Sequence, residues 1–236
     1  LRHHGGGGVE DVSFQLARGQ FTVVTGRMGS GKTTLLRAVL GLLVPQQGEI
    51  VWNGRRLADP TSWMRPPRVA YTAQVPALLS GSVRENILLG LPDEETLIRQ
   101  AIWRAAFERD LAGLEHGLDT PIGASGVRLS GGQAQRLAAA RMLVRQAELL
   151  VVDDLSSALD HDTEQVLWQR LRHFGDTQPA ILAVSYRSSL MQQADQIVVL
   201  DQGRVAARGT YGELLHSSAL FRSIVQAGPR HESRPA

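Results

Sequence analysis

Residues 26–33 read Gly-Arg-Met-Gly-Ser-Gly-Lys-Thr, which is the pattern G-x-x-x-x-G-K-[ST]. They follow a β-branched run at 21–25 that predicts a buried strand, and residues 32–40 predict a helix ended by Gly41 and Pro45. Glycines in such a strand–loop–helix unit let successive backbone N–H groups point inward around phosphate oxygens, and the helix N-terminus adds positive potential. The stretch therefore predicts a phosphate-binding loop in an α/β protein.

The basic side chain inside this loop belongs to the only lysine of the chain. Of the 25 Lys and Arg residues, all but Lys32 are arginine. A compact ammonium fits a tight loop and reaches the β- and γ-phosphates of ATP, whereas the planar fork of arginine is wider and more rigid. The hydroxyl of Thr33 is expected to bind Mg²⁺. The nucleotide-binding residues predicted from the loop are Gly26, Met28, Gly29, Ser30, Gly31, Lys32, Thr33 and Thr34.

Composition is that of a globular protein and excludes several kinds of site. The 236 residues carry a formal charge of +2 and contain no cysteine. Disulfides, thiolate metal sites and a cysteine nucleophile are thus excluded, and the charge gives no reason to expect nucleic acid as a partner. The apolar run at 35–44 is interrupted by Arg37 and Gly41, and it is shorter than the roughly 18 to 20 residues that a membrane helix needs.

Short apolar runs alternate with stretches of helical periodicity, which favours a mostly parallel sheet with helices on its faces. Strands are expected at 49–52, 69–72, 149–152, 180–185 and 196–200, and helices at 134–146 and 163–174. The 49–52 strand runs into a tight turn at Asn53-Gly54. Between 82 and 146, apolar spacing is helical on two faces: Leu97, Ala101, Ile102 and Ala105 on one, and Leu137, Ala140, Arg141 and Val144 on the other.

Two further features would complete a nucleotide site. Asp153 follows the run at 149–152, at the strand end where ligands bind in open α/β sheets, so its carboxylate is expected to hold Mg²⁺. Residues 129–133 read Leu-Ser-Gly-Gly-Gln, just before an expected helix. An ordinary serine-capped helix start would explain the serine but not both glycines. We therefore predict a second phosphate-binding helix N-terminus, which could serve the nucleotide of another chain; its residues are Ser130, Gly131, Gly132 and Gln133.

These motifs, in this order, make nearly the whole chain resemble the nucleotide-binding domain of ATP-binding cassette (ABC) transporters. Residues 129–133 match the family's signature, Gln74 its glutamine loop, and Ser-Ala-Leu-Asp at 157–160 its D-loop, so that Asp160 joins the predicted nucleotide-binding residues. The resemblance implies that two such domains face head to tail around two ATP molecules, each site pairing one phosphate loop with the other domain's signature. It also implies that Gln74 contacts Mg²⁺ and relays the ATP state to a transmembrane domain.

The resemblance implies a domain organisation. We expect one domain over 1–236, with a P-loop NTPase core at 9–75 and 147–227 that includes an antiparallel β subdomain. An α-helical subdomain that carries the signature is inserted at 76–146. Residues 1–8 are interpreted as the remnant of an upstream segment and 228–236 as a flexible tail.

Finer similarity is to exporters. Residues 74–87 are similar to the exporter stretch after the glutamine loop, and 117–123 to the run before the exporter signature. The implied partners are a second nucleotide-binding domain and a transmembrane domain, at the cytoplasmic face of the cell membrane. At the next position, where the family usually carries Glu, this chain has Ala124, so its contact with the membrane domain is expected to differ. The family's adenine-stacking aromatic is missing from 1–8, so it either lies upstream or is replaced by a histidine, His3 or His4.

Two predicted catalytic positions depart from the family. Asp154 stands where the family has a glutamate that positions or deprotonates the attacking water, and Tyr186 stands where it has a histidine that contacts the γ-phosphate. Aspartate is one methylene shorter, and tyrosine, with an unperturbed pKa of about 10, cannot act as a cation near neutral pH. We interpret Asp154, Tyr186 and Gln74 as a degenerate catalytic set that binds ATP and hydrolyses it slowly, in one half of a heterodimeric exporter.

Several alternatives stay open at this point. Asp154 could work after a small shift, with Tyr186 as a tolerated hydrogen-bond donor, in a fully active homodimer. A small-molecule kinase or a GTPase would use the same phosphate loop, but neither explains residues 129–133, and no N-K-x-D-like guanine reader is present. A cassette ATPase acting on DNA or ribosomes, or a regulatory module that only senses ATP, would use the same motifs.

Overall fold

The protein is described by a computed structural model over residues 8–123, 126–174 and 178–228. Two compact units form: unit 1 comprises Leu1–Arg65 and Ala180–Ala236, and unit 2 comprises Pro66–Pro179. Ala124 lies outside the described residues. So do the expected N-terminal remnant, apart from Gly8, and the expected C-terminal tail, apart from Gly228. Among the described residues, none of the helices combines the length and the apolar character that a membrane span requires.

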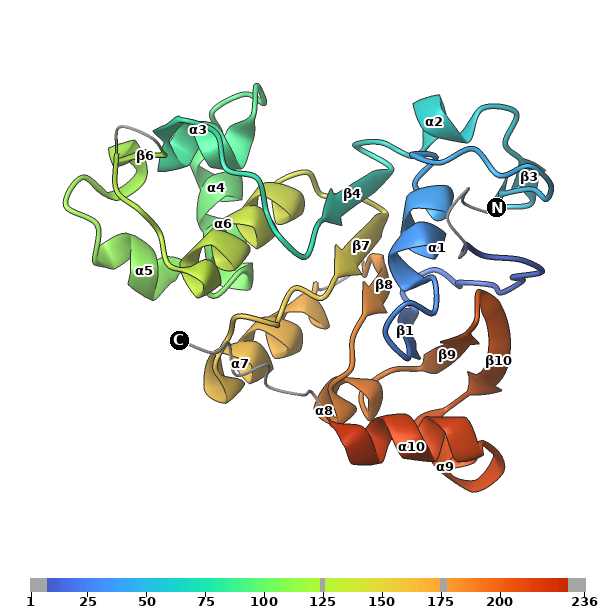
Figure 1. Cartoon of the computed structure of the whole chain (residues 1–236). Coiled ribbons are helices and arrows are strands. Elements are labelled where there is room, and N and C mark those ends of the chain that lie inside the picture. The colour runs from blue at the N-terminus through green and yellow to red at the C-terminus, as the bar shows by residue number, and fades with distance from the viewer. Residues whose placement is uncertain (1–7, 124–125, 175–177, 229–236) are drawn as a thin grey trace. The chain divides into compact units, whose positions relative to one another are not determined.

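Unit 1 contains strands in the order β10-β9-β1-β8 (Figure 1). The central strand β1 (Phe21–Gly26) pairs in parallel with β8 (Ala180–Val184) and with β9 (Gln196–Asp201). The edge strand β10 (Arg204–Gly209) pairs antiparallel with β9. Every residue of β1 and of β8 is buried, as the β-branched and apolar runs predict. The expected strands at 21–25, 180–185 and 196–200 are thus confirmed to within one residue.

The helices of unit 1 cover these strands. Figure 1 shows α1 (Lys32–Val39) on one side of β1 and β9, and α9 (Tyr211–Ser217) with α10 (Ala219–Ala227) on the other. The short elements of the unit are α2 (Pro60–Trp63), α8 (Ser188–Met191) and the hairpin of β2 (Val51–Trp52) with β3 (Arg55–Arg56).

The hairpin corrects one prediction. Only Val51 and Trp52 of the expected 49–52 strand belong to β2, so the antiparallel element is shorter than its apolar pattern indicates. The predicted turn is confirmed, because Asn53 and Gly54 adopt the left-handed conformation, with φ of 50° and 77°. A two-residue pairing suffices to reverse the chain there.

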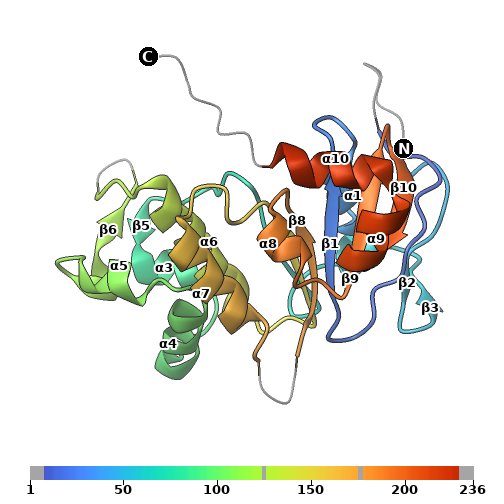
Figure 2. The same ribbon diagram turned by 90° about the horizontal axis from the view of Figure 1, so that it is seen from below.

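Unit 2 contains the parallel pair β4 (Val69–Thr72) and β7 (Leu149–Asp153), with Val69 opposite Leu149. Figure 2 shows its helices gathered around α6. The helices are α3 (Val83–Leu88), α4 (Glu95–Arg104), α5 (Glu108–Ala112), a 3₁₀ turn at Gly117–Asp119, α6 (Gly131–Leu143) and α7 (His161–Leu171). A two-residue antiparallel pair, β5 (Gly81–Ser82) with β6 (Pro121–Ile122), lies within this helical region.

Two details of the helical region differ from the predictions. Helix α6 begins at Gly131, earlier than the expected 134, because the Ser130 side chain caps it. In the first turn of α4 the buried residue is Ile98, whereas Leu97, which we expected on that face, is half-buried. The apolar stripe of α4 is therefore displaced by one position at its N-terminal end.

Helices α5 and α6 are joined by an ion pair with two parallel contacts. Arg136 Nε lies 2.6 Å from Asp110 Oδ2, and Arg136 Nη2 lies 2.8 Å from Asp110 Oδ1. The two side chains are only 12% and 15% exposed. Bidentate geometry with little water around it fixes the register of the two helices.

Replacing this arginine, Arg136→Met, is expected to lower the free energy of unfolding by about 2 to 4 kcal/mol, because a largely buried carboxylate loses its partner. The matched control is Arg99→Met, whose pair with Glu95 is 2.8 Å long but 76% and 47% exposed. This control is expected to cost less than about 0.5 kcal/mol. Urea unfolding followed by circular dichroism measures both, and equal losses would contradict the assignment.

Candidate nucleotide-binding site

The predicted phosphate loop connects β1 to α1. Gly26 ends the strand, Gly31 is the N-cap residue of the helix, and no side chain caps that helix. Gly26 has φ of 151° and Gly31 has φ of 98°. A Cβ at Gly26 would lie 2.2 Å from the carbonyl oxygen of Leu200, and one at Gly31 would lie 2.7 Å from that of Gly8. Both positions therefore require glycine, for backbone conformation and for space.

Lys32 lies in the first turn of α1 and is 6% exposed. Its ammonium donates to the carbonyl oxygens of Gly26 and Arg27, both at 2.8 Å, and to Ser30 Oγ at 3.3 Å. The loop thus encloses a cation and surrounds it with oxygens. Phosphate oxygens are acceptors of the same kind, so this arrangement fits the polyphosphate that the sequence predicts.

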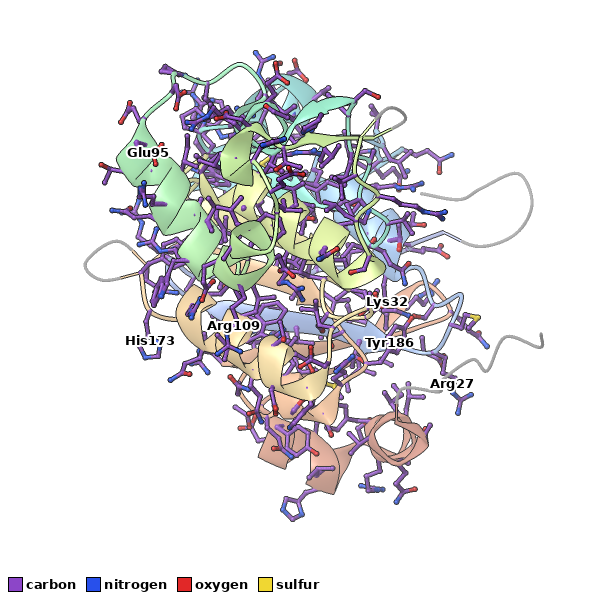
Figure 3. All side chains as sticks on the ribbon, turned by 90° about the vertical axis from the view of Figure 1, so that its left-hand side faces the viewer. Arg27, Lys32, Glu95, Arg109, His173 and Tyr186 are labelled. Atoms are coloured by element: carbon purple, nitrogen blue, oxygen red, sulfur yellow. The ribbon has the colours of Figure 1, made fainter. Side chains whose placement is uncertain are left out.

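Tyr186 lies against the same ammonium. It follows β8 and the buried Ser185, and Lys32 Nζ lies 4.6 Å from the centroid of its ring (Figure 3). This is the distance of a cation–π contact, in which the electron-rich face of the ring attracts the charge. The residue at the expected histidine position therefore lies against the lysine of the predicted phosphate loop, 154 positions away in the chain.

Unit 2 holds the predicted acidic residues. Asp153 is the last residue of β7 and is 4% exposed. The next residue, Asp154, has φ of 51°, and its Oδ2 accepts a hydrogen bond from Gln74 Nε2 at 3.2 Å. Gln74 and Asp154 are thus together although 80 residues separate them. The predicted Mg²⁺ ligands Gln74 and Asp153 belong to unit 2, and the third, Thr33, belongs to unit 1.

The signature begins helix α6 with a capping box. Ser130 Oγ accepts from Gln133 N at 3.2 Å, and Gln133 Oε1 accepts from Ser130 N at 2.8 Å. The serine-capped start considered above is therefore real, and it accounts for the serine and the glutamine. Gly131 and Gly132 form the first turn of the helix and pack against Ala158.

Asp160 caps α7. Its Oδ1 accepts from Thr163 N at 2.9 Å and its Oδ2 from Thr163 Oγ1 at 2.8 Å. Hydrogen bonds from the Thr163 amide and hydroxyl hold the pKa of this carboxyl below its usual value. The structure gives Asp160 a role in folding, while its contact with nucleotide stays a prediction.

Gln135 was missed by our reading of the sequence. It is 3% exposed, and its amide hydrogen-bonds to three residues in two segments of unit 2: Gln74, and the adjacent Ser157 and Ala158. The available signal was weak: a glutamine on the second turn of a helix whose neighbouring residues are small and apolar. A glutamine in that setting lies on a solvated helix face as often as it is buried.

The comparisons with known proteins agree with these motifs. Residues 9–157 match the family model described as ABC transporter. This match covers more than half of the chain, so the chain belongs to the ABC transporter family, in which it corresponds to the ATP-binding domain. The family membership favours the ABC interpretation over the kinase and GTPase alternatives.

Its relatives are of exporter type. A probable multidrug resistance ABC transporter ATP-binding/permease protein, YheI of Bacillus subtilis (strain 168), is 38% identical over 216 residues, covering 91% of this chain and 37% of the relative. An ATP-dependent lipid A-core flippase of Alkalilimnicola ehrlichii is 37% identical over 220 residues, covering 92% of this chain and 37% of the relative.

A solved structure shares the fold. The bacterial Atm1-family ABC exporter with ATP bound has a TM-score of 0.85 and 31% identity, covering 93% of this chain and 39% of that one. The predicted α/β fold, mostly parallel with antiparallel strands and helices added, is thereby confirmed. The chain spans less than two fifths of the length of each of these three proteins.

Proposed function

We propose that this chain is the ATP-binding and ATPase part of an exporter, acting at the cytoplasmic face of a membrane. Mg-ATP is held by the phosphate loop, and a second ABC domain faces it head to tail, so that each signature completes the other's site. The observation that carries the proposal is the buried Lys32 ammonium, enclosed by oxygens in a loop where Gly26 and Gly31 leave no space for a side chain. The exporter assignment rests on the likeness to the relatives above.

The residues present suit Mg-ATP. Carboxylate and hydroxyl oxygens are the ligands that Mg²⁺ prefers, and it needs only one or two of them when phosphates supply others. Asp153 and Thr33 are of this type and are expected to hold the ion. The ion, when bound, neutralises negative charge on the β- and γ-phosphates. Gln74 is also expected to contact the ion, and its Nε2 donates a hydrogen bond to Asp154 Oδ2.

The chain's own catalytic site is degenerate in this proposal. Asp154 carries its carboxylate one methylene short of the glutamate that the family places there, and catalysis tolerates displacements of only about 0.5 Å. The neutral ring of Tyr186 lies on Lys32, where the family's histidine would contact the γ-phosphate. These two features favour binding over hydrolysis. The intact signature is then expected to serve a competent site on a different ABC domain, in a heterodimer.

Mg-ATP is expected to convert the purified chain from monomer to dimer, because a head-to-tail dimer encloses nucleotide between phosphate loop and signature. Sedimentation velocity at micromolar protein measures this, with Mg-ADP as the control that lacks the γ-phosphate. A chain that stays monomeric at saturating Mg-ATP, alone and beside a second ABC domain, would overturn the proposed assembly.

A further inference from the structure

Four residues of unit 2 form a closed ring of hydrogen bonds, which we call the Gln135 ring: Gln135, Gln74, Asp154 and Ser157. Gln135 Nε2 donates to the carbonyl oxygen of Gln74 at 3.3 Å and to Ser157 Oγ at 2.9 Å. Ser157 Oγ donates to the carbonyl oxygen of Asp154 at 3.1 Å. Gln74 Nε2 donates to Asp154 Oδ2 at 3.2 Å and closes the ring.

Each hydrogen-bonding group of the Gln135 amide has a partner. Both Nε2 hydrogens are donated within the ring, and Oε1 accepts from Ala158 N at 3.1 Å. The side chain is 3% exposed, so water is not available to replace these partners. A buried amide with every polar group paired holds the attached segments in one arrangement, since each broken bond would leave an unpaired group.

The ring joins the signature helix to the predicted catalytic residues. Gln135 is on α6, two residues after the end of the signature, while Ser157 and Ala158 belong to the D-loop. The glycines of the signature also touch this loop, because a Cβ at Gly132 would lie 3.0 Å from the carbonyl oxygen of Ala158. Signature, D-loop, Gln74 and Asp154 are therefore connected through one side chain.

We infer that Gln135 is a positioning residue that couples the signature surface to Gln74 and Asp154. The inference rests on the proposed function, in which the signature meets the nucleotide of a second ABC domain. A displacement of α6 when that nucleotide binds is passed through the Gln135 amide to the D-loop and to the Gln74 backbone. Gln135 itself touches neither nucleotide nor water in this scheme.

The test is Gln135→Met, which keeps the length and helix propensity of the side chain but removes its amide. Mg-ATP affinity of the monomer is expected to stay within about twofold of wild type, because residues 26–34 of the phosphate loop are not part of the Gln135 ring and the Gln74 side chain is unchanged. The Mg-ATP-dependent dimer is expected to be weakened about tenfold, since the amide makes three buried hydrogen bonds. Titration of a fluorescent ATP analogue gives the first quantity and sedimentation equilibrium gives the second.

Gln178→Met is the matched control. This glutamine of unit 2 also bonds to the backbone twice, accepting from Phe174 N at 3.0 Å and donating to the carbonyl oxygen of Leu171 at 3.2 Å, away from all the motifs. The thermal stability of the Gln178→Met variant is expected to fall as that of Gln135→Met does. Its dimer dissociation constant is expected to stay within about twofold of wild type. A general loss of stability would lower the dimer constants of both variants together.

Ser157→Ala provides a second variant should Gln135→Met fail to fold. It opens the ring at one point and is expected to weaken the dimer about threefold, and the double variant should be no worse than Gln135→Met alone. Additive losses of dimer affinity in the double variant would overturn this inference but not the proposed function. A Gln135→Met dimer affinity within about twofold of wild type would do the same. A wild-type chain that binds no Mg-ATP would overturn the proposed function as well, so the two failures are distinguishable.

Discussion

Replacing Lys32 with alanine is expected to weaken Mg-ATP binding at least about a hundredfold, because one ammonium supplies the charge-assisted hydrogen bonds to the phosphates. The ammonium already lies among loop oxygens, 2.8 Å from two carbonyl oxygens, so little rearrangement is needed to turn it to phosphate. The ATP-dependent dimer should disappear with it. Isothermal titration calorimetry with Mg-ATP measures the affinity directly.

The control for this variant is Arg37→Ala, which removes an exposed positive charge from the same helix. It is expected to change Mg-ATP affinity by less than about twofold, because an exposed charge at the other end of the helix is screened by salt. Similar losses in the two variants would mean that the net charge of α1, and not the loop, governs binding.

Combining Asp154→Glu with Tyr186→His is expected to raise the ATPase rate of the chain alone by about tenfold or more. Misplacement of a catalytic group by about 1 Å can cost about a hundredfold in rate, and a glutamate would restore the missing methylene. The histidine would replace a neutral ring by a side chain that can be cationic near pH 7. Steady-state phosphate release at saturating Mg-ATP measures the rate.

The two single variants separate the contributions. Asp154→Glu alone is expected to give most of the increase, because the carboxylate acts on the attacking water, while Tyr186→His alone should mainly change Mg-ATP affinity through Lys32. Asp154→Asn is the control that keeps the length of the side chain and removes the charge, and it should not raise the rate. A double variant no faster than wild type would mean that Asp154 and Tyr186 do not limit turnover.

Local features of the sequence predicted much of the fold. The β-branched run at 21–25 and the apolar runs at 149–152 and 180–185 are buried strands, because such residues leave few alternatives to the sheet interior. The edge strand β10 was not anticipated, since its burial alternates and four of its six residues are arginine, glycine or exposed alanine. The strand expected at 49–52 is shorter than predicted. The length of the β2–β3 pairing depends on the partner strand, which the apolar pattern of one segment does not reveal.

The parts of the candidate site that consist of local sequence motifs could be predicted. The loop at 26–33 and the capping box of Ser130 and Gln133 are both local, and both are present. The contacts of Lys32 with Tyr186 and of Gln74 with Asp154 join residues far apart in the chain. Gln135 could not be identified, because helical periodicity does not distinguish a buried, fully bonded glutamine from a solvated one.

In the proposed function this chain holds Mg-ATP firmly and cleaves it slowly, and a single-turnover experiment measures both properties. Wild-type chain in excess is mixed with a trace of radiolabelled Mg-ATP, and bound ATP and ADP are separated over time. We predict that ATP is retained and cleaved at below about 0.01 s⁻¹, against a median of about 10 s⁻¹ for enzymes. Cleavage of the bound ATP at about 1 s⁻¹ or faster by the chain alone would contradict the account.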